Sequence, residues 1–210
     1  WAWPGRARMT PAKRTLDIIC ALGLSVILAP VALVIATLIL CIDGRPVLYP
    51  SERMKTPQLA FTLWKFRTMR PAPADSGVSG GDKSDRITPL GRFLRRSRLD
   101  ELPQLINVLR GDISFVGPRP PLRRYVEMFP NLYEQVLRQR PGLTGLATLV
   151  FHKTEERLLS DCRTPEETEN VYTRRCIPRK ARLDLIYAER RSIGLDIRLI
   201  FGTVFRFLKP

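Results

Sequence analysis

The clearest pattern in the chain is an apolar stretch from Ile18 to Ile42, 25 residues without a charged side chain. About 20 apolar residues are enough for a helix to cross a bilayer. A cleaved signal peptide would have a shorter run followed by a small-residue cleavage site, and the core helix of a soluble protein would keep a polar stripe. The pattern therefore predicts a membrane-embedded segment, with Asp17 and Asp43 at its interfacial ends.

Pro30 lies at the centre of this stretch. A proline inside a helix removes one backbone hydrogen bond and clashes with the preceding turn, so we expect a kink or break near Pro30. Basic residues flank the stretch at Lys13, Arg14, Arg45, Arg53 and Lys55. Basic flanks favour the cytoplasmic side of a membrane. Two arrangements remain open from the residues alone: a re-entrant helix–break–helix that returns to the same side, and a kinked single-pass anchor.

The rest of the chain has shorter patterns, which predict an α+β fold that is predominantly helical. Alternating apolar and polar positions predict strands at 47–49 and 61–69, followed by a loop at 70–85. Helical spacing predicts helices at 88–96, at about 100–109, at 180–187 and from 195 onward. Phe93 and Leu94 should face the core. The last helix suits either the membrane interface, with Phe207 and Leu208 in its apolar patch, or the domain core.

Charge and residue usage narrow the classes of partner. The formal net charge of +15 suits anionic partners such as phospholipid headgroups or phosphorylated substrates. No basic face interleaved with aromatic residues is evident, so nucleic acid is not an expected partner. The four cysteines form no CxxC pair and His152 is the single histidine. A zinc site and Ser-His or Cys-His catalysis are therefore not expected, and we interpret His152 as a surface or packing residue.

The adjacent acids Asp100 and Glu101 are the strongest candidates for chemistry. Pro103 fits only the first turn of a helix, so a helix should begin at about Asp100, and the acids could simply cap it. Capping does not explain the arginines around them, which are Arg95, Arg96, Arg98 and Arg119. Nearby cations would hold Asp100 ionised, as a nucleophile or metal ligand requires.

Two turns supply groups that can bind phosphate. The first contains Arg119 between prolines, and a guanidinium can bind phosphate through two parallel hydrogen bonds. The second runs from Arg140 to Gly145 and offers Arg140, the hydroxyl of Thr144 and backbone N–H groups. Together with the acidic pair, and with Arg95 as a further phosphate-binding candidate, the two turns predict a diphosphate site.

These segments resemble one family in order along about 135 residues. They are Lys13–Asp17, the apolar stretch, Lys65–Met69, Leu99–Leu105, Asn107–Asp112, Ser114–Pro120 and Arg140–Gly145. The chain resembles the bacterial sugar transferases, which are monotopic polyprenyl-phosphate phosphoglycosyl transferases. It departs from them at Ala29 and Leu146, where many members have serine and tryptophan. Its segment 150–178 is unusually charged, and we expect this segment to help select the donor.

The resemblance implies a reaction and a set of roles. Such enzymes transfer a sugar-1-phosphate from a nucleotide diphosphate sugar, usually a UDP-sugar, to undecaprenyl phosphate and release UMP. Asp100 would be the nucleophile, forming a covalent phosphosugar intermediate, and Glu101 would assist; Mg²⁺ would be bound at these two carboxylates. Arg119, Arg95, Arg140 and Thr144 would bind substrate phosphates.

The resemblance also implies a location and an organisation. It favours the re-entrant hairpin broken at Pro30, in the phospholipid of the bacterial inner membrane, with the enzyme at the cytoplasmic face. The chain would comprise a tail or cloning remnant at 1–12, a membrane hairpin at 13–44 and a catalytic domain with interfacial C-terminal helices at 45–210. A homodimer is left open. The rival hypotheses are a non-catalytic membrane-bound scaffold of the same fold and a nucleic-acid-binding protein, and the latter does not account for the apolar stretch.

Overall fold

A computed structural model describes residues 9–70, 78 and 80–208 of the chain. Its helices are α1 (Pro11–Ile42), η1 (Gly81–Arg86), α2 (Pro89–Ser97), η2 (Leu99–Glu101), α3 (Gln104–Arg110), α4 (Arg123–Met128), α5 (Pro130–Val136), α6 (Leu146–Ser160), α7 (Pro165–Val171), η3 (Tyr172–Cys176), α8 (Ile177–Arg190) and α9 (Ile193–Leu208). Its strands are β1 (Leu48–Met54), β2 (Ala60–Phe66), β3 (Ser114–Val116) and β4 (Gly142–Thr144). The predominantly helical α+β class is confirmed. Of the predicted loop at 70–85, residues 71–77 and 79 lie outside the described residues, while 81–85 form most of the helical turn η1 and correct the prediction there. Residues 1–8 of the predicted tail and the side chains of Phe207 and Leu208 also lie outside the described residues.

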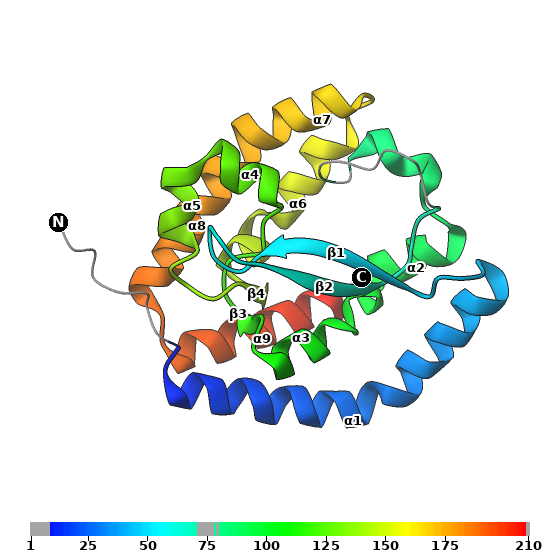
Figure 1. The fold of residues 1–210 in the computed structure, drawn as a ribbon, viewed down its shortest axis with the longest axis horizontal. Coiled ribbons are helices and arrows are strands. Elements are labelled where there is room, and N and C mark those ends of the chain that lie inside the picture. Colours follow the sequence, from blue (N-terminus) through cyan, green and yellow to red (C-terminus); the bar gives the residue numbers. More distant parts are fainter. Residues whose placement is uncertain (1–8, 71–77, 79, 209–210) are drawn as a thin grey trace.

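The helix α1 begins at Pro11, where the hydroxyl of Thr10 accepts a hydrogen bond from the backbone N–H of Lys13 at 3.3 Å. It runs without interruption through Pro30 to Ile42. Figure 1 shows it along one edge of the molecule, curving in its C-terminal half. We expected a break near Pro30, but the described helix is continuous and bends instead, so two separate helical arms are not shown.

Two polar contacts fasten the N-terminal end of α1 to the domain. Lys13 Nζ donates to Asp196 Oδ2 of α9 at 2.5 Å. The buried Asp17 accepts at Oδ1 from the hydroxyl of Ser114 and from the backbone N–H of Phe115, both at 3.1 Å. The first turns of α1 are therefore held against β3 and α9.

The C-terminal end of α1 is fastened to the same domain through Arg67. The guanidinium of Arg67 donates to the carbonyls of Asp43, Gly44 and Arg45 at 2.6, 2.7 and 3.1 Å. Apolar contacts accompany these bonds, in a buried cluster that comprises Ile35, Ile39, Phe66 and Leu94. Between the two fastened ends, α1 exposes large apolar side chains, namely Ile19, Leu22, Leu24, Val26, Ile27, Val31, Leu33, Val34, Leu38, Leu40 and Ile42.

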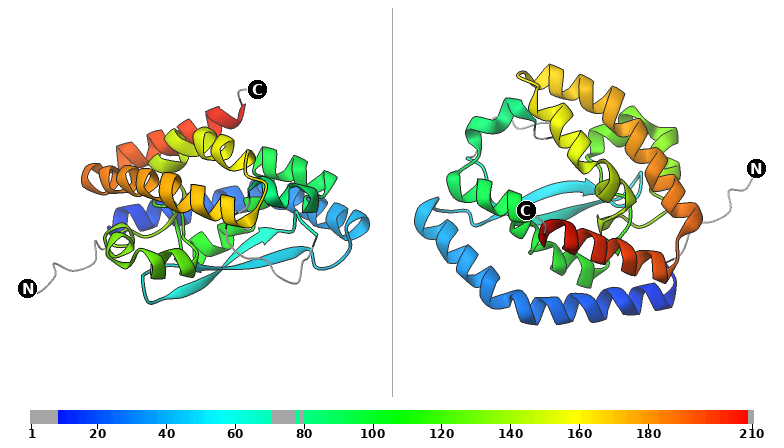
Figure 2. Two further views of the ribbon diagram at one scale, coloured as in Figure 1. Left: turned by 90° about the horizontal axis from the view of Figure 1, so that it is seen from above. Right: turned by 180° about the vertical axis from the view of Figure 1, so that it is seen from behind.

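Two small sheets carry the loops of the domain. β1 and β2 form an antiparallel hairpin in register from Leu48↔Phe66 to Met54↔Ala60, at the two expected strand positions. β3 and β4 are parallel, with Val116 opposite Thr144. Seen from above in Figure 2, the hairpin and α9 lie at opposite faces of the molecule.

The core fills the space between the hairpin and the helices. One buried cluster lies among α4 to α8 and a second joins α1, α3, β3 and α9. Leu94 of α2 is buried as expected, but Phe93 is 60% exposed, which corrects the prediction that both face the core. Consecutive helical residues point about 100° apart, so a short helix packed along one side cannot bury both.

Candidate active site

The acidic pair lies in a tight turn between two helices. α2 ends at Ser97, its C-cap Arg98 adopts the left-handed conformation at φ 59°, and Asp100 and Glu101 follow in the single turn η2. The helix α3 begins only at Gln104, a few residues later than predicted, with no side-chain cap. Asp100 and Glu101 are buried, with 6% and 8% of their surfaces exposed. The turn thus directs both carboxyls into the protein, and neither of them caps α3.

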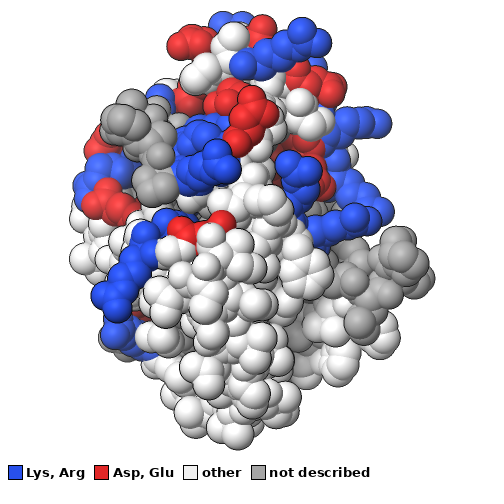
Figure 3. Space-filling model, turned by 90° about the vertical axis from the view of Figure 1, so that its right-hand side faces the viewer, with Lys and Arg blue, Asp and Glu red and all other residues white. Residues whose placement is uncertain are grey.

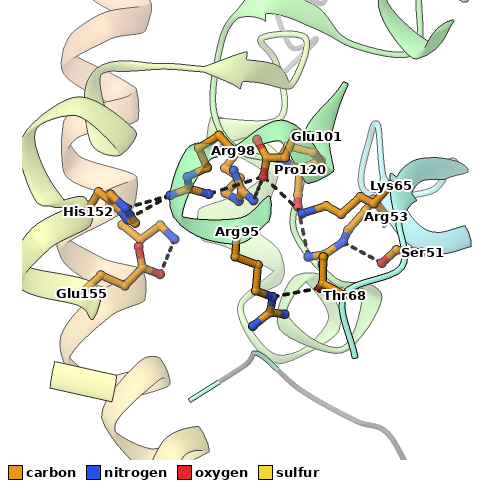
Figure 4. Close-up of polar contacts among 12 residues, drawn as sticks. Ser51, Arg53, Lys65, Thr68, Arg95, Arg98, Glu101, Pro120, His152 and Glu155 are labelled. Carbon is orange, nitrogen blue, oxygen red and sulfur yellow. Dashed lines mark hydrogen bonds and ion pairs between the residues drawn. The ribbon is translucent and has the colours of Figure 1, made fainter. Parts of the chain in front are cut away.

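Glu101 is surrounded by cations. Its Oε1 accepts from Arg119 Nη2 at 2.7 Å, from Lys65 Nζ at 3.2 Å and from Arg98 Nη1 at 3.4 Å (Figure 4). Burial opposes the ionised form, but the three cations, led by Arg119, lower the pKa of Glu101 well below its ordinary value. Glu101 is therefore a fixed negative charge that orients three positive side chains.

Asp100 lies in a different environment from its neighbour. Its Oδ1 is buried and has no hydrogen-bond partner among the described residues. Burial, followed by the negative charge of Glu101, raises the pKa of Asp100, against the opposing effect of Lys65, Arg98 and Arg95. We expected the cations to hold Asp100 ionised; they gather on Glu101 instead. Asp100 keeps an oxygen available for a substrate or an ion.

A large open cavity of about 1770 Å³ adjoins the pair. The side formed by the hairpin and the Arg119 loop carries Arg53, Lys65 and Arg119, and Arg95 and Arg98 also line the cavity. Opposite this side, the lining comes from α6, η3 and α8. Because so many cations face one hollow, it suits an anionic ligand such as a diphosphate.

The predicted phosphate-binding residues fall into two groups. Arg119 and Arg95 line the cavity, and Arg95 Nε donates to the hydroxyl of Thr68 at 3.0 Å. Arg140 and Thr144 are not brought to it: the Arg140 guanidinium lies near Gly111, and the Thr144 hydroxyl is 2.7 Å from that of Thr203. The parallel pairing of β3 with β4 explains why they lie elsewhere. It packs the backbone of the Arg140–Gly145 turn against the backbone of the Arg119 turn, away from the cavity.

Three contributors were not singled out from the sequence. Lys65 contacts Glu101. The alternation of side chains in β2 predicts that Lys65 shares a face with Leu63, but it does not predict the contact with Glu101. Arg53 Nη1 donates to the carbonyl of Pro120 at 3.4 Å, and burial, followed by the charge of Arg119, lowers its pKa to about 10.

The third contributor is His152 of α6, which we interpreted as a surface or packing residue. It lines the cavity, and Arg98 Nη2 donates to its Nε2 at 2.8 Å. Figure 4 shows His152 and Arg98 pointing toward each other at the edge of the acidic turn. The contact joins residues 54 positions apart, which no local pattern could indicate.

Comparison with known proteins decides the family. The family model described as bacterial sugar transferase matches residues 8–210. The chain belongs to this family. The resemblance read from the motifs is thereby confirmed, and the cavity described above is the candidate active site of a bacterial sugar transferase.

Relatives of this bacterial sugar transferase carry informative names. It is 39% identical over 205 residues to the exopolysaccharide production protein PSS of Rhizobium leguminosarum, covering 91% of this chain and 92% of the relative. It is 35% identical over 198 residues to a UDP-glucose:undecaprenyl-phosphate glucose-1-phosphate transferase of Klebsiella pneumoniae, covering 92% of this chain and 39% of the relative. It is 30% identical over 198 residues to a UDP-N-acetylgalactosamine-undecaprenyl-phosphate N-acetylgalactosaminephosphotransferase of Aeromonas hydrophila, covering 91% and 42%. The chain thus spans about two fifths of the length of the second and third of these relatives.

Proposed function

We propose that this protein transfers a sugar-1-phosphate from a UDP-sugar to undecaprenyl phosphate, with release of UMP, as a membrane step of surface glycan assembly. The names of the relatives support the substrates. The observation that carries the proposal is the contrast within the acidic pair: Glu101 is held by three cations, while Asp100 keeps a buried oxygen without a partner beside a cationic cavity. The alternative, a non-catalytic scaffold, does not account for that oxygen.

In the first step, Asp100 attacks the phosphorus that carries the sugar. A bond forms between the carboxylate oxygen and this phosphorus, and the bond to the bridging oxygen breaks, so UMP leaves with the electron pair. In the second step, an oxygen of undecaprenyl phosphate attacks the same phosphorus, the bond between this phosphorus and the Asp100 oxygen breaks, and the carboxylate leaves with the electron pair. This route lets a soluble donor and a lipid acceptor use one nucleophile in turn.

The cations make this chemistry feasible. Two anionic substrates must approach an anionic nucleophile, and the charge on the leaving phosphate grows as its bond breaks. Arg119, Lys65 and Arg98 are already oriented by Glu101, so they need little reorganisation when a diphosphate binds. Their role is to bind the phosphates and to stabilise the charge that develops on UMP.

The acidic pair also fits a magnesium ion. Mg²⁺ is commonly bound through one or two carboxylates together with substrate phosphates. The described residues contain no group of three or more His, Cys, Asp or Glu side chains suited to a metal. Asp100 through Oδ1, which accepts from no described residue, and Glu101 through Oε2, since the three cations contact its Oε1, would hold the ion together with the diphosphate, and the ion would neutralise phosphate charge.

The membrane arrangement that we propose is a re-entrant one at the cytoplasmic face of the inner membrane. α1 is long and apolar enough to cross a membrane. Its most apolar 18-residue stretch has a mean hydropathy of 2.8, and only 11% of that stretch is buried. Both of its ends are fastened to one domain, through Lys13 and Asp17 at one end and Arg67 at the other. Because both ends contact the same domain, they would lie on the same side of the membrane, as a re-entrant segment requires. Figure 3 shows a broad surface without charged side chains over the C-terminal half of α1, with charges gathered above it.

The reaction is tested by incubating purified protein with Mg²⁺, undecaprenyl phosphate and a panel of UDP-sugars and measuring UMP. We expect UMP release that depends on the lipid acceptor, and a mass increase of one sugar-phosphate on the wild-type protein when the acceptor is omitted. The variant Asp100→Asn should show neither. Absence of UMP and of the adduct with every donor would contradict the proposal and favour the scaffold.

Topology is tested separately by labelling cysteines introduced at the exposed positions 12 and 45. The background lacks Cys20 and Cys41, while Cys162 and Cys176 are buried. A re-entrant helix predicts that an impermeant reagent labels neither position in intact cells and both after permeabilisation. Labelling of one position alone in intact cells would indicate a helix that spans the membrane.

A further inference from the structure

The side of the cavity opposite the hairpin contains a second polar cluster that the proposed chemistry does not use. Lys180 Nζ of α8 donates to Glu155 Oε1 of α6 at 2.7 Å and to the Tyr172 hydroxyl of η3 at 3.4 Å. Figure 4 shows Glu155 on α6, on the far side of Arg98 from the hairpin. η3 is a turn of π-helix, an uncommon form that often occurs at functional sites. These side chains line the same cavity as Asp100.

Asp184 is the unusual member of this cluster. It lies one turn of α8 beyond Lys180, is 8% exposed and lines the cavity. No hydrogen bond joins its carboxyl to another described residue, and burial raises its pKa to about 7, against the opposing effect of the Lys180 charge. A largely buried carboxyl without a hydrogen-bond donor costs free energy, and a ligand in the cavity that donates a hydrogen bond would offset this cost.

The cluster borders the phosphate-binding side of the cavity. The pKa of Arg119 is raised mainly by Glu101 but also by Glu155, so both carboxylates lie within electrostatic reach of one guanidinium. A ligand whose phosphate is bound at Arg119 would place the group attached to that phosphate against Glu155, Lys180 and Asp184. In the proposed donor, that group is the sugar.

The chemistry of the cluster suits a sugar better than the other parts of the donor. The carboxyls of Glu155 and Asp184 outnumber the single ammonium of Lys180, so the cluster disfavours binding of a further phosphate. A uracil ring offers a single N–H donor, which Glu155 and Asp184 would share. A hexose offers several hydroxyls, each able to donate to a carboxylate or to accept from Lys180 and Tyr172.

We propose that Glu155, Lys180 and Asp184 form the subsite for the hydroxyl groups of the donor hexose, and that Asp184 determines which hexose is preferred. This inference rests on the proposed transfer from a UDP-sugar. It also gives a physical basis to the expectation that the charged segment 150–178 helps select the donor, because α6 and η3 come from this segment and supply Glu155 and Tyr172.

The test compares the full chain with Asp184→Ala, Asp184→Asn and a matched control, Glu189→Gln, which changes an exposed acid on the same helix. UMP release is measured with UDP-glucose, UDP-galactose, UDP-N-acetylglucosamine and UDP-N-acetylgalactosamine. For Asp184→Ala, we expect kcat/KM with the preferred sugar to fall roughly 10- to 100-fold, the size of one hydrogen bond to a charged group. The other sugars should lose less, so the preference narrows. Glu189→Gln should match the wild type.

Inhibition by UMP separates a sugar subsite from a general defect. UMP lacks the sugar, so its inhibition constant should be unchanged in both Asp184 variants, whose melting temperatures should not fall. An equal loss for every sugar, or weaker inhibition by UMP, would overturn the subsite while leaving the proposed function in place. A wild-type protein that neither releases UMP nor binds any of the four donors would overturn the proposed function and the subsite with it.

Discussion

The two sides of the cavity differ in whether their buried carboxyl is hydrogen-bonded. On one side, Glu101 accepts from three cations at a single oxygen, and the whole group is ordered before any substrate arrives. On the other side, Asp184 is as deeply buried but has no hydrogen bond to another described residue. A saturated carboxylate can hold a fixed arrangement, whereas an unsaturated one gains stability only when a ligand supplies the missing donor. The first arrangement suits the step shared by all donors, and the second suits discrimination among them.

The largest effect should come from Asp100. Replacing it with asparagine removes the nucleophile but keeps the size of the side chain, so we expect UMP release to fall by at least about 10⁴-fold. UMP release and the intact mass of the protein are measured together. Asp161→Asn, which changes the exposed acid after α6, should behave as the wild type. Residual turnover above one hundredth of the wild-type rate would assign the nucleophile elsewhere.

The next effect compares the two turns that were both predicted from the sequence to bind substrate phosphate. Arg119→Ala removes the closest cation of Glu101 and a phosphate-binding group, and we expect kcat/KM to fall roughly 10²- to 10³-fold. Arg140→Ala should leave kcat/KM close to that of the wild type, because Arg140 lies beside Gly111 and not at the cavity. Equal losses in the two variants would support the prediction from the sequence that both turns bind substrate phosphate.

These two turns also show how far the sequence alone can lead. The apolar helix, the positions of the first two strands, and the presence of the acidic pair and Arg119 at one site could be predicted, because each depends on a local pattern or on a motif. The exclusion of Arg140 could not, since it depends on the parallel register Val116↔Thr144 between segments distant in the chain. The contact of Lys65 with Glu101 is equally non-local, over 36 positions.

The far side of the cavity was even less accessible to sequence reasoning. Asp184 lies in a helix with ordinary amphipathic spacing, and nothing in its neighbours indicates a buried carboxyl without a partner. Its burial arises only when α8 packs against α5 and α6. The unusual charge of 150–178 was the one signal, and it indicated a region rather than a residue.

A third prediction concerns stability and pH at Asp184. Its folded-state pKa of about 7 lies above the ordinary value of 3.8, so the folded protein binds this proton more tightly than the unfolded chain. The contribution of Asp184 to the free energy of unfolding is therefore full below about pH 4. It falls by up to about 1.4 kcal/mol per pH unit until the pH exceeds 7. Asp184→Asn should remove this slope, which thermal melting between pH 5 and pH 8 would measure.

The control for this measurement is again Glu189→Gln, which changes the same charge at an exposed position. The melting temperature of Asp184→Asn should exceed that of the wild type by a margin that grows from pH 5 to pH 7. A margin that stays constant over this range would mean that Asp184 is already ionised and partnered in the folded protein. Such a result would weaken the contrast between the two sides of the cavity.

The smallest effect is expected at His152, which lies between the two sides of the cavity. His152 of α6 accepts from Arg98, which in turn makes the longest of the three contacts with Glu101, at 3.4 Å. His152→Ala should leave Arg98 less ordered and lower kcat/KM about 2- to 10-fold, less than a hydrogen bond to a charged group is worth, because His152 acts only through Arg98. His152→Gln keeps an acceptor and should recover most of the loss with every donor. If the alanine variant instead changed sugar preference, His152 would belong to the discriminating side, and the boundary between the two sides would lie at Arg98.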